Sequence, residues 1–279
     1  MTTDAQTLTI AQRRPSRVGN FALVGREVLN GVWPLLTLAL AWWVLFLLMP
    51  SNTFLKSPIQ VAQYLTEPGE FTRLIAALGS SLWLVVLGYV VATVLSLALA
   101  SAMVVSRVAE SIAMPLAVIV GSIPIIVITP VVLMLAGRGT GTAVIVCTIV
   151  TFFPCLINII AGMRSPARQM IDLTRALGAS GWITLLKVRM PSAVPGLISA
   201  SKLALPAALS GVILTEFVAT GTGIGNYINS GRANFAFNQM WAGISATLIA
   251  SVLLYSVLGA LETILRRKYT PEPSRSANG

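Results

Sequence analysis

The feature of this sequence that most limits its fold is a series of long apolar stretches separated by short charged links. No charged residue occurs between Arg73 and Arg107, a gap longer than the about 20 residues that a helix needs to cross the hydrocarbon core of a bilayer. Over the chain 56% of residues are hydrophobic and only 10% are charged, whereas soluble domains carry about 25% charged residues. The sequence therefore predicts an all-α, polytopic membrane protein, because helices satisfy their backbone hydrogen bonds within hydrocarbon.

The polar segments divide the chain into a membrane domain, residues 32–265, flanked by polar tails, residues 1–31 and 266–279. Six spans are expected, over about 32–49, 82–105, 111–137, 142–162, 196–220 and 240–265. A charged loop, residues 163–195, separates the fourth span from the fifth, and a polar turn, residues 226–238, separates the fifth from the sixth. Three prolines in the third span, Pro124 among them, predict a kinked or interrupted helix.

The positive charges indicate the orientation of the spans. Fourteen Lys and Arg residues fall in the two tails, the link between spans two and three, and the loop 163–195, against four on the other side. Cytoplasmic segments carry the excess of positive charge. We therefore expect both termini and the loop 163–195 in the cytoplasm, and we assign the net charge of +10 to topology rather than to nucleic acid binding.

The loop 163–195 carries signals for two short helices. Ser165 is expected to cap the first, and Gly178 to end it in the left-handed conformation. Ser180 is expected to cap the second, which Pro191 and Pro195 would close.

The first of these helices is predicted to be amphipathic. Its two faces, each with a spacing of i, i+4 and i+7, are Met170, Thr174 and Leu177 and, on a different side, Arg168, Asp172 and Arg175. Such a helix can lay its apolar face in the groove of a partner. From the pattern alone, an ordinary solvated cytoplasmic loop is the alternative interpretation.

The residues Asp172 to Ser180, followed by Met190-Pro191 and Pro195, resemble the EAA loop of ABC importer permeases. Asp172 stands where that pattern has Glu, and Leu173-Thr174 replace two alanines. The resemblance implies a type I ABC importer-like fold, in which this loop is the coupling helix that inserts into a cytoplasmic ATPase. The coupling residues it implies are Arg168, Asp172, Arg175, Ala176, Leu177, Gly178, Ala179 and Pro191.

Other segments extend the resemblance over most of residues 55–262. Phe152-Phe153-Pro154 with Asn158 resembles a fourth-span pattern of the family, and Lys202, Glu216 and Gly223-Ile224-Gly225 match the register of its fifth span. Together with Leu55-Lys56-Ser57-Pro58, these matches resemble the nitrate, sulfonate and taurine branch. The residues assigned on this basis to the translocation path or its gate are Pro124, Asn158, Lys202 and Glu216.

Two of these assignments have structural alternatives. Lys202 and Glu216 share a face of the fifth span but lie roughly 21 Å apart, so they cannot pair directly within one helix. Charged groups inside a span usually face the bundle interior or a cavity and are often functional. Lys202 can instead extend to the cytoplasmic surface, and Glu216 can instead form a structural hydrogen bond to a neighbouring helix.

The absence of several motifs narrows the function. The sequence has no His and no Walker A loop, so neither a metal centre, a catalytic site nor ATP hydrolysis is expected in this chain. Its two cysteines, Cys147 and Cys155, lie too far apart on a helix for a disulfide and are expected to be buried small residues.

The resemblance thus implies a non-enzymatic permease subunit in a bacterial inner membrane. Its expected partners are an ATPase dimer that binds ATP and Mg²⁺, an extracytoplasmic binding protein and a second permease, either another copy in a homodimer or a similar chain. The expected substrate is a small anion such as a sulfonate or nitrate, and no cofactor is expected in the chain itself. The alternatives are a carrier or channel driven by an ion gradient and, third, a membrane-embedded enzyme.

Overall fold

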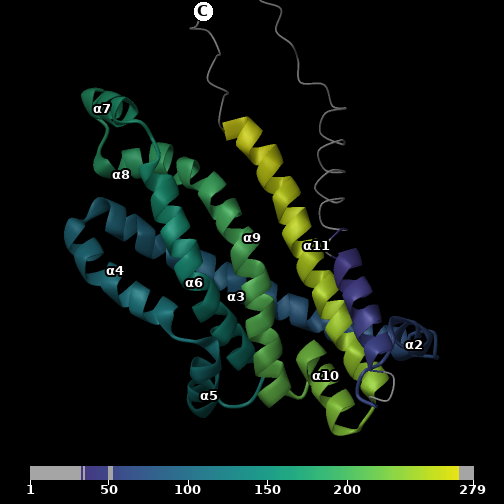
Figure 1. The fold of residues 1–279 in the computed structure, drawn as a ribbon. Helices are drawn as coiled ribbons and strands as arrows, with labels where there is room; N and C mark the ends of the chain where they lie inside the picture. The colour runs from purple at the N-terminus through teal and green to yellow at the C-terminus, as the bar shows by residue number, and fades with distance from the viewer. Residues whose placement is uncertain (1–32, 34, 50–52, 270–279) are drawn as a thin grey trace, which may run out of the picture.

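The computed structural model describes residue 33 and residues 35–49 and 53–269, with side chains as far as residue 262. The N-terminal tail and most of the C-terminal tail lie outside the described residues. Every regular element in the described part is helical (Figure 1).

The helices follow one another with short connections. After an apolar helix, Leu35–Leu48, they are α2 (Pro58–Tyr64), α3 (Glu70–Val105), α4 (Arg107–Ser122), α5 (Ile125–Ala136), α6 (Thr140–Arg164), α7 (Arg168–Ala176), α8 (Gly181–Thr184), α9 (Met190–Thr215), α10 (Gly223–Ala233) and α11 (Phe237–Tyr269). Two π-helical turns, Leu185–Arg189 and Glu216–Thr220, continue α8 into α9 and end α9. Helix α10 lies where the sequence predicted a polar turn.

By length and composition, four helical stretches in the described residues can cross a membrane: α3, α6, the stretch Gly181–Thr220 and α11. The pair α4 and α5 makes a fifth if it counts as one span, although it bends by 100° at its break. The first expected span is represented by the shorter helix Leu35–Leu48. The count of six spans therefore stays a prediction.

The break between α4 and α5 has its cause in the sequence. Pro124 lies at the junction with an extended backbone, at φ −60° and ψ 133°. Because the proline has no N–H and disfavours a helical residue before it, Ile123 leaves the helix at ψ 125°. The interruption that the prolines predict is present.

Helix α6 is the centre of the bundle. It packs most extensively against α9 and α3, and its buried side chains include Cys147 and Cys155, both fully enclosed. The expectation that these two cysteines are buried is confirmed. Most other long helices expose apolar side chains such as Trp83 and Leu203, as expected for a surface that faces lipid.

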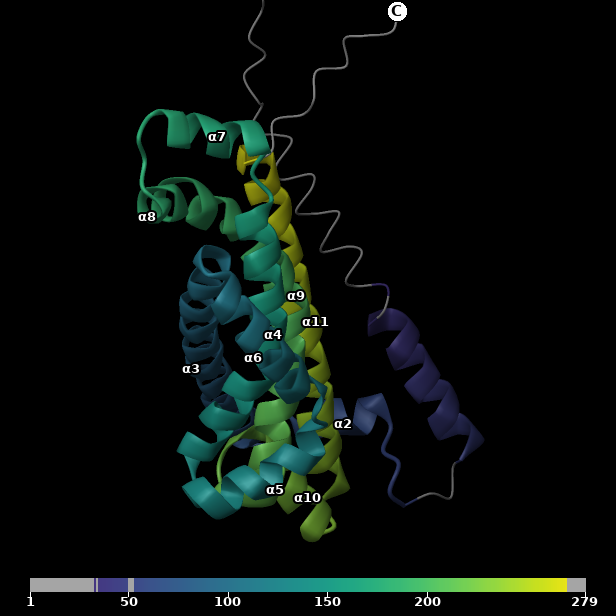
Figure 2. The ribbon, with the colours of Figure 1, turned by 90° about the vertical axis from the view of Figure 1, so that its left-hand side faces the viewer.

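The bundle has two distinct ends. Helices α7 and α8 and the last turns of α11 lie together at one end, and α5 and α10 lie at the other (Figures 1 and 2). We call these the α7 end and the α10 end. The stretch Gly181–Thr220 runs between them.

Candidate functional site

Helix α7 ends in a Schellman motif centred on Gly178. The N–H of Gly178 donates to the carbonyl of Arg175, and the N–H of Ala179 donates to the carbonyl of Thr174, at 2.9 and 3.0 Å. Gly178 has a φ of +75°, a conformation that costs other residues energy because their Cβ is crowded. The turn then places Ser180 as the cap of α8, where its Oγ accepts from the N–H of Ile183. Both local predictions, for Gly178 and for Ser180, are confirmed.

No residue of α7 is buried. The exposed fractions of its apolar side chains are 53% for Met170, 59% for Leu173 and 77% for Leu177. The coupling residues Arg168, Asp172, Arg175, Ala176, Leu177 and Gly178 are all exposed, as is Pro191, while Ala179 is half-buried. Helix α7 thus presents three large apolar side chains and two arginines at one end of the bundle.

Two details of this loop differ from the prediction. Ser165 does not cap α7. It ends α6 instead, and its Oγ donates to the carbonyl of Gly162 at 2.8 Å. Pro191 and Pro195 do not close the second helix, because α9 begins at Met190 and runs through both. The π turn before them explains this: the N–H of Met190 reaches back to the carbonyl of Leu185, a wider turn that precedes the first proline ring.

An ion pair ties the base of this loop to the broken span. Arg164, at the end of α6, contacts Glu110, in the first turn of α4, at 2.6 Å. Both side chains are partly exposed, so the pair is worth little in stability. It places the start of α4 beside the end of α6.

The proposed path residues Pro124 and Asn158 lie on separate elements. Pro124 lies at the break between α4 and α5. Asn158 lies within α6, where its Nδ2 donates to the carbonyl of Pro154 one turn earlier, at 2.8 Å. No hydrogen bond joins these two described residues, and the amide of Asn158 is used within its own helix.

Lys202 pairs with a carboxylate that the sequence analysis did not assign. Its Nζ lies 3.0 Å from Glu262 of α11 and 5.1 Å from the centre of the Tyr255 ring. Glu262 also accepts from Ser199 at 2.7 Å. Both charged side chains are largely buried, with 20% and 14% exposed. The pair joins α9 to α11, and only the long-range fold reveals it.

Glu216 is enclosed at the α10 end of α9. Its side chain is 1% exposed. The carboxylate accepts from the Ser81 hydroxyl at 2.7 and 2.8 Å and from the N–H of Gly225 at 2.9 Å. This geometry matches the structural alternative, a hydrogen bond to a neighbouring helix, and adds a contact with α10.

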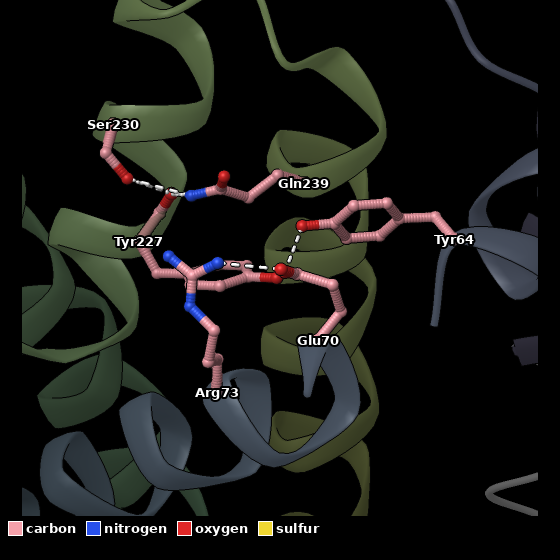
Figure 3. Close-up of polar contacts among 6 residues, drawn as sticks. All are labelled: Tyr64, Glu70, Arg73, Tyr227, Ser230 and Gln239. Atoms are coloured by element: carbon pink, nitrogen blue, oxygen red, sulfur yellow. Dashed lines mark hydrogen bonds and ion pairs between the residues drawn. The ribbon is translucent and has the colours of Figure 1, made fainter. Parts of the chain in front are cut away.

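A second polar cluster near the α10 end joins α2, α3, α10 and α11, and the sequence analysis missed it (Figure 3). The Glu70 carboxylate accepts from the Tyr64 hydroxyl and pairs with Arg73 at 2.7 Å. Gln239 donates to the carbonyl of Tyr227 at 2.9 Å. Burial raises the pKa of both tyrosines above the ordinary value, and the protonated Tyr64 hydroxyl is the one that donates to Glu70.

Among the described residues no group of three or more Cys, Asp or Glu side chains is arranged to hold a metal. The described geometry is a helical bundle with an exposed amphipathic helix at one end and buried polar joints between its spans. These features fit the class of membrane subunits through which importers move solutes. A family model described as the binding-protein-dependent transport system inner membrane component matches residues 92–271, and the chain belongs to this family.

Relatives of known assignment are permeases of ABC importers. The chain is 30% identical over 146 residues to the riboflavin transport system permease protein of Chloroflexus aurantiacus, which covers 52% of this chain and 54% of the relative. It is 26% identical to the taurine transport system permease protein of Escherichia coli, over 89% of this chain and 91% of the relative. It is 25% identical to the nitrate import permease protein of Leptolyngbya laminosa, over 94% of each. The chain thus spans about half the length of the first relative and nearly all of the other two.

Solved structures confirm the fold. A chain of the MetNI methionine ABC transporter in an inward-facing conformation superposes with a TM-score of 0.60 at 19% identity, over 74% of this chain and 100% of that one. A chain of a bacterial alginate ABC transporter superposes with a TM-score of 0.57 at 15% identity, over 90% and 98%. The all-helical, type I importer-like fold expected from the sequence is confirmed. The family and the apolar helices also support the expected location of a multi-pass protein in the inner membrane.

Proposed function

We propose that this chain forms the translocation path of an ATP-driven importer for a small anion such as a sulfonate or nitrate. The relatives that match over nearly their whole length are permeases for taurine and nitrate, which supports an anionic substrate. The riboflavin and formylaminopyrimidine permeases among the relatives make a vitamin-type solute the next candidate. An extracytoplasmic binding protein would deliver the solute at the α10 end.

The observation that carries this proposal is the exposed amphipathic helix α7. Met170, Leu173 and Leu177 are each more than half exposed, although they lie at the end of the bundle where no lipid is expected to cover them. An apolar helix face of this kind fits a groove on another protein. A cytoplasmic ATPase supplies that groove in our proposal, and Arg168 and Arg175 add a positive charge at its edge.

In the proposed assembly two permease copies enclose the path and two ATPase subunits hold the two α7 helices. ATP and Mg²⁺ bind to the ATPase and not to this chain. Closure of the ATPase dimer brings the α7 helices together and switches the path between inward-open and outward-open states. ATP drives the switch because it binds one of the two states more tightly.

The first test is purification of the tagged protein from its native membrane in mild detergent, with partners identified by mass spectrometry. Recovery of an ATPase with a Walker A sequence in a fixed ratio supports the proposal. Recovery of the permease alone, from membranes in which other complexes survive, contradicts it and favours the carrier driven by an ion gradient.

The second test breaks the end of α7 without touching its exposed face. Gly178→Val forces a β-branched residue into a left-handed conformation, although open space surrounds the position. We expect ATP-dependent uptake to fall by about tenfold or more, with normal insertion in the membrane. Gly181→Val is the matched control, since Gly181 is also surrounded by open space and has no positive φ. Normal uptake with Gly178→Val contradicts the role of α7 in coupling.

A further inference from the structure

The buried carboxylate of Glu216 lies at the N-terminus of another helix. Gly225, which donates its N–H to Glu216, is the third residue of α10. Ile224, the second residue, donates its N–H to Ser81 at 2.8 Å, and Ser81 in turn donates to Glu216. Thr222, the residue at the cap position, provides no side-chain hydrogen bond.

Glu216 and Ser81 therefore replace the missing cap of α10 from two other elements. The first N–H groups of a helix have no partner within it, and an anion is stabilised there by the helix dipole. No salt bridge to Glu216 is found among the described residues, so the N–H of Gly225 and the Ser81 hydroxyl are the groups that hold the buried carboxyl group. The same contacts join three elements: α9, α3 and α10.

The close approach of α10 to the end of α9 depends on two glycines. A Cβ at Gly223 would lie 2.1 Å from the Glu216 carboxyl carbon, and Gly223 has a φ of +86°. A Cβ at Gly225 would lie 2.3 Å from the carbonyl oxygen of Ile213 in α9. No other residue fits at either position without moving α10 away.

Two further contacts hold α10 to the π turn that ends α9. Asn229 donates its Nδ2 to the carbonyl of Phe217 at 3.0 Å. The Arg232 guanidinium lies 5.5 Å from the centre of the Phe217 ring. Helix α10 is thus attached to the end of α9 at its beginning, middle and last turn.

The other end of the same helical stretch begins at α7. Gly181–Thr220 forms 40 residues of uninterrupted helix, roughly 60 Å along its path, which starts after the α7 turn, passes through the π turn Leu185–Arg189 and ends at Thr220, one turn after Glu216. Figure 2 shows this stretch running from the α7 end to the α10 end. A displacement of α7 can therefore reach α10 through one continuous helical stretch, provided that the joint at Glu216 holds.

We propose that Glu216 is a positioning residue that joins the end of α9 to α10 and α3, so that α10 moves with α9 when α7 is displaced. This inference rests on the proposed function for the origin of the displacement. It assigns Glu216 to the transmission of motion and not to contact with the solute or with a transported ion.

The two roles of Glu216 differ in their response to a neutral side chain of the same shape. In Glu216→Gln the amide oxygen can accept from Gly225 and the amide nitrogen can donate to Ser81, so the joint survives. In Glu216→Ala both contacts are lost. A titrating or solute-binding carboxylate would fail equally in both variants, because each lacks the charge.

The experiment follows α10 with spin labels in the purified full-length protein, together with any ATPase that accompanies it. Asn234, at the end of α10, and Leu135, in α5, are both exposed and are replaced by Cys. The native cysteines are fully enclosed and give little background. The distance distribution between the labels is measured without nucleotide and after trapping with ATP and vanadate.

We expect a narrow distribution that shifts on trapping in the parent and in Glu216→Gln, and a broad distribution without a shift in Glu216→Ala. Amide exchange over residues 221–233 should be about tenfold faster in Glu216→Ala, because the hydrogen bonds at the start of α10 are lost. Gly225→Ala should behave like Glu216→Ala, although the Glu216 carboxylate is still present in that variant. Gly79→Ala, in α3 with open space around it, is the control.

Equal defects in Glu216→Gln and Glu216→Ala, or a narrow and shifting distribution in Glu216→Ala, would overturn the proposal. If the parent protein carries no ATPase and shows no shift on trapping, the proposed function fails. The nucleotide-free distributions and the amide exchange then still decide whether Glu216 holds α10. A variant that no longer inserts is replaced by Ser81→Ala, which removes the same joint from the side of α3.

Discussion

Lys202 and Glu262 show how a charged pair is accommodated between two membrane spans. The ammonium group has a carboxylate at 3.0 Å and an aromatic ring at 5.1 Å, and the carboxylate also accepts from a serine hydroxyl. Placing a charge in lipid-like surroundings is costly unless such partners replace water. Loss of one partner leaves the other charge poorly compensated, which makes the pair more sensitive to single than to double substitution.

We expect Lys202→Met to lower the free energy of unfolding by about 2 kcal/mol, less than for a fully buried pair because part of each side chain is exposed. Lys202→Met combined with Glu262→Gln should recover at least half of that loss. Thermal unfolding in detergent, monitored by the appearance of aggregated protein, measures both. Arg138→Met, at an exposed position, is the control and should change little. A double variant that is less stable than Lys202→Met would contradict the view that Lys202 and Glu262 stabilise the protein as a pair.

The sequence correctly places Lys202 and Glu216 in one helical span, but it does not reveal their partners. Spacing within a helix excludes a direct bond between them, and it carries no information about Glu262 or Ser81, which lie on other helices. The residue that faces Glu216 is 135 positions away. Long-range pairs of this kind depend on the packing of the whole bundle, so a single sequence predicts the type of residue and not its contact.

At the scale of elements, α6 and α9 pack closely because glycines lie at their contact. A Cβ at Gly162 of α6 would lie 2.7 Å from the Cα of Ala193 in α9, and a Cβ at Gly196 would lie 2.6 Å from the carbonyl oxygen of Asn158. Small residues allow membrane helices to approach backbone to backbone, where van der Waals contact is greatest. In both cases the nearest atom belongs to the backbone and cannot move aside as a side chain can.

Gly162→Ala should therefore destabilise the protein by about 1–3 kcal/mol, the usual cost of forcing one carbon into a packed core. The thermal unfolding midpoint in detergent is the measurement. Gly141→Ala is the matched control on the same helix, because open space surrounds Gly141, and it should be neutral. Equal midpoints for the two variants would show that α6 and α9 are not held by this contact.

The sequence predicts the ends of helices well where the interactions that end them lie within one turn. Gly178 ends α7 and Ser180 caps α8 as their residue types indicate, since both effects act within one turn. Pro191 and Pro195 fail as stop signals because a π turn before them changes the hydrogen-bond register, which the sequence alone does not show. Ser165 lies at the end of α6 and not at the start of α7, because α6 runs to Arg164, past its predicted end at residue 162, and α7 begins only at Arg168.

For the whole molecule, two groups of side chains mark the expected borders of the membrane along α11. Trp241 stacks on Trp42 with ring centres 5.0 Å apart, and tryptophans favour the interface between lipid and water. Glu262 lies 21 positions later, about 31 Å along a helix, which matches a hydrocarbon core of about 30 Å. The Trp241 border is near the α10 end and the Glu262 border near the α7 end.

The excess of positive charge at the α7 end predicts that α7 faces the cytoplasm and α10 the outside. Cysteine labelling in intact cells tests this orientation directly, because both native cysteines are enclosed. Asn234→Cys should react with a maleimide that cannot cross membranes, whereas Arg168→Cys should react only after the cells are permeabilised. Both positions are exposed, so the side of the membrane is the main difference between them.

Cells lysed in a denaturing detergent, which also removes any ATPase from α7, provide the control, since both cysteines should then react to a similar extent. Labelling of Arg168→Cys in intact cells, with Asn234→Cys unlabelled, would show that the protein has the opposite orientation in the membrane. An ATPase in the cytoplasm would then have no access to α7, and the proposed coupling would fail together with the orientation. The expected labelling pattern would place α7 in the cytoplasm, where ATP is present, and α10 outside, where a binding protein would deliver its solute.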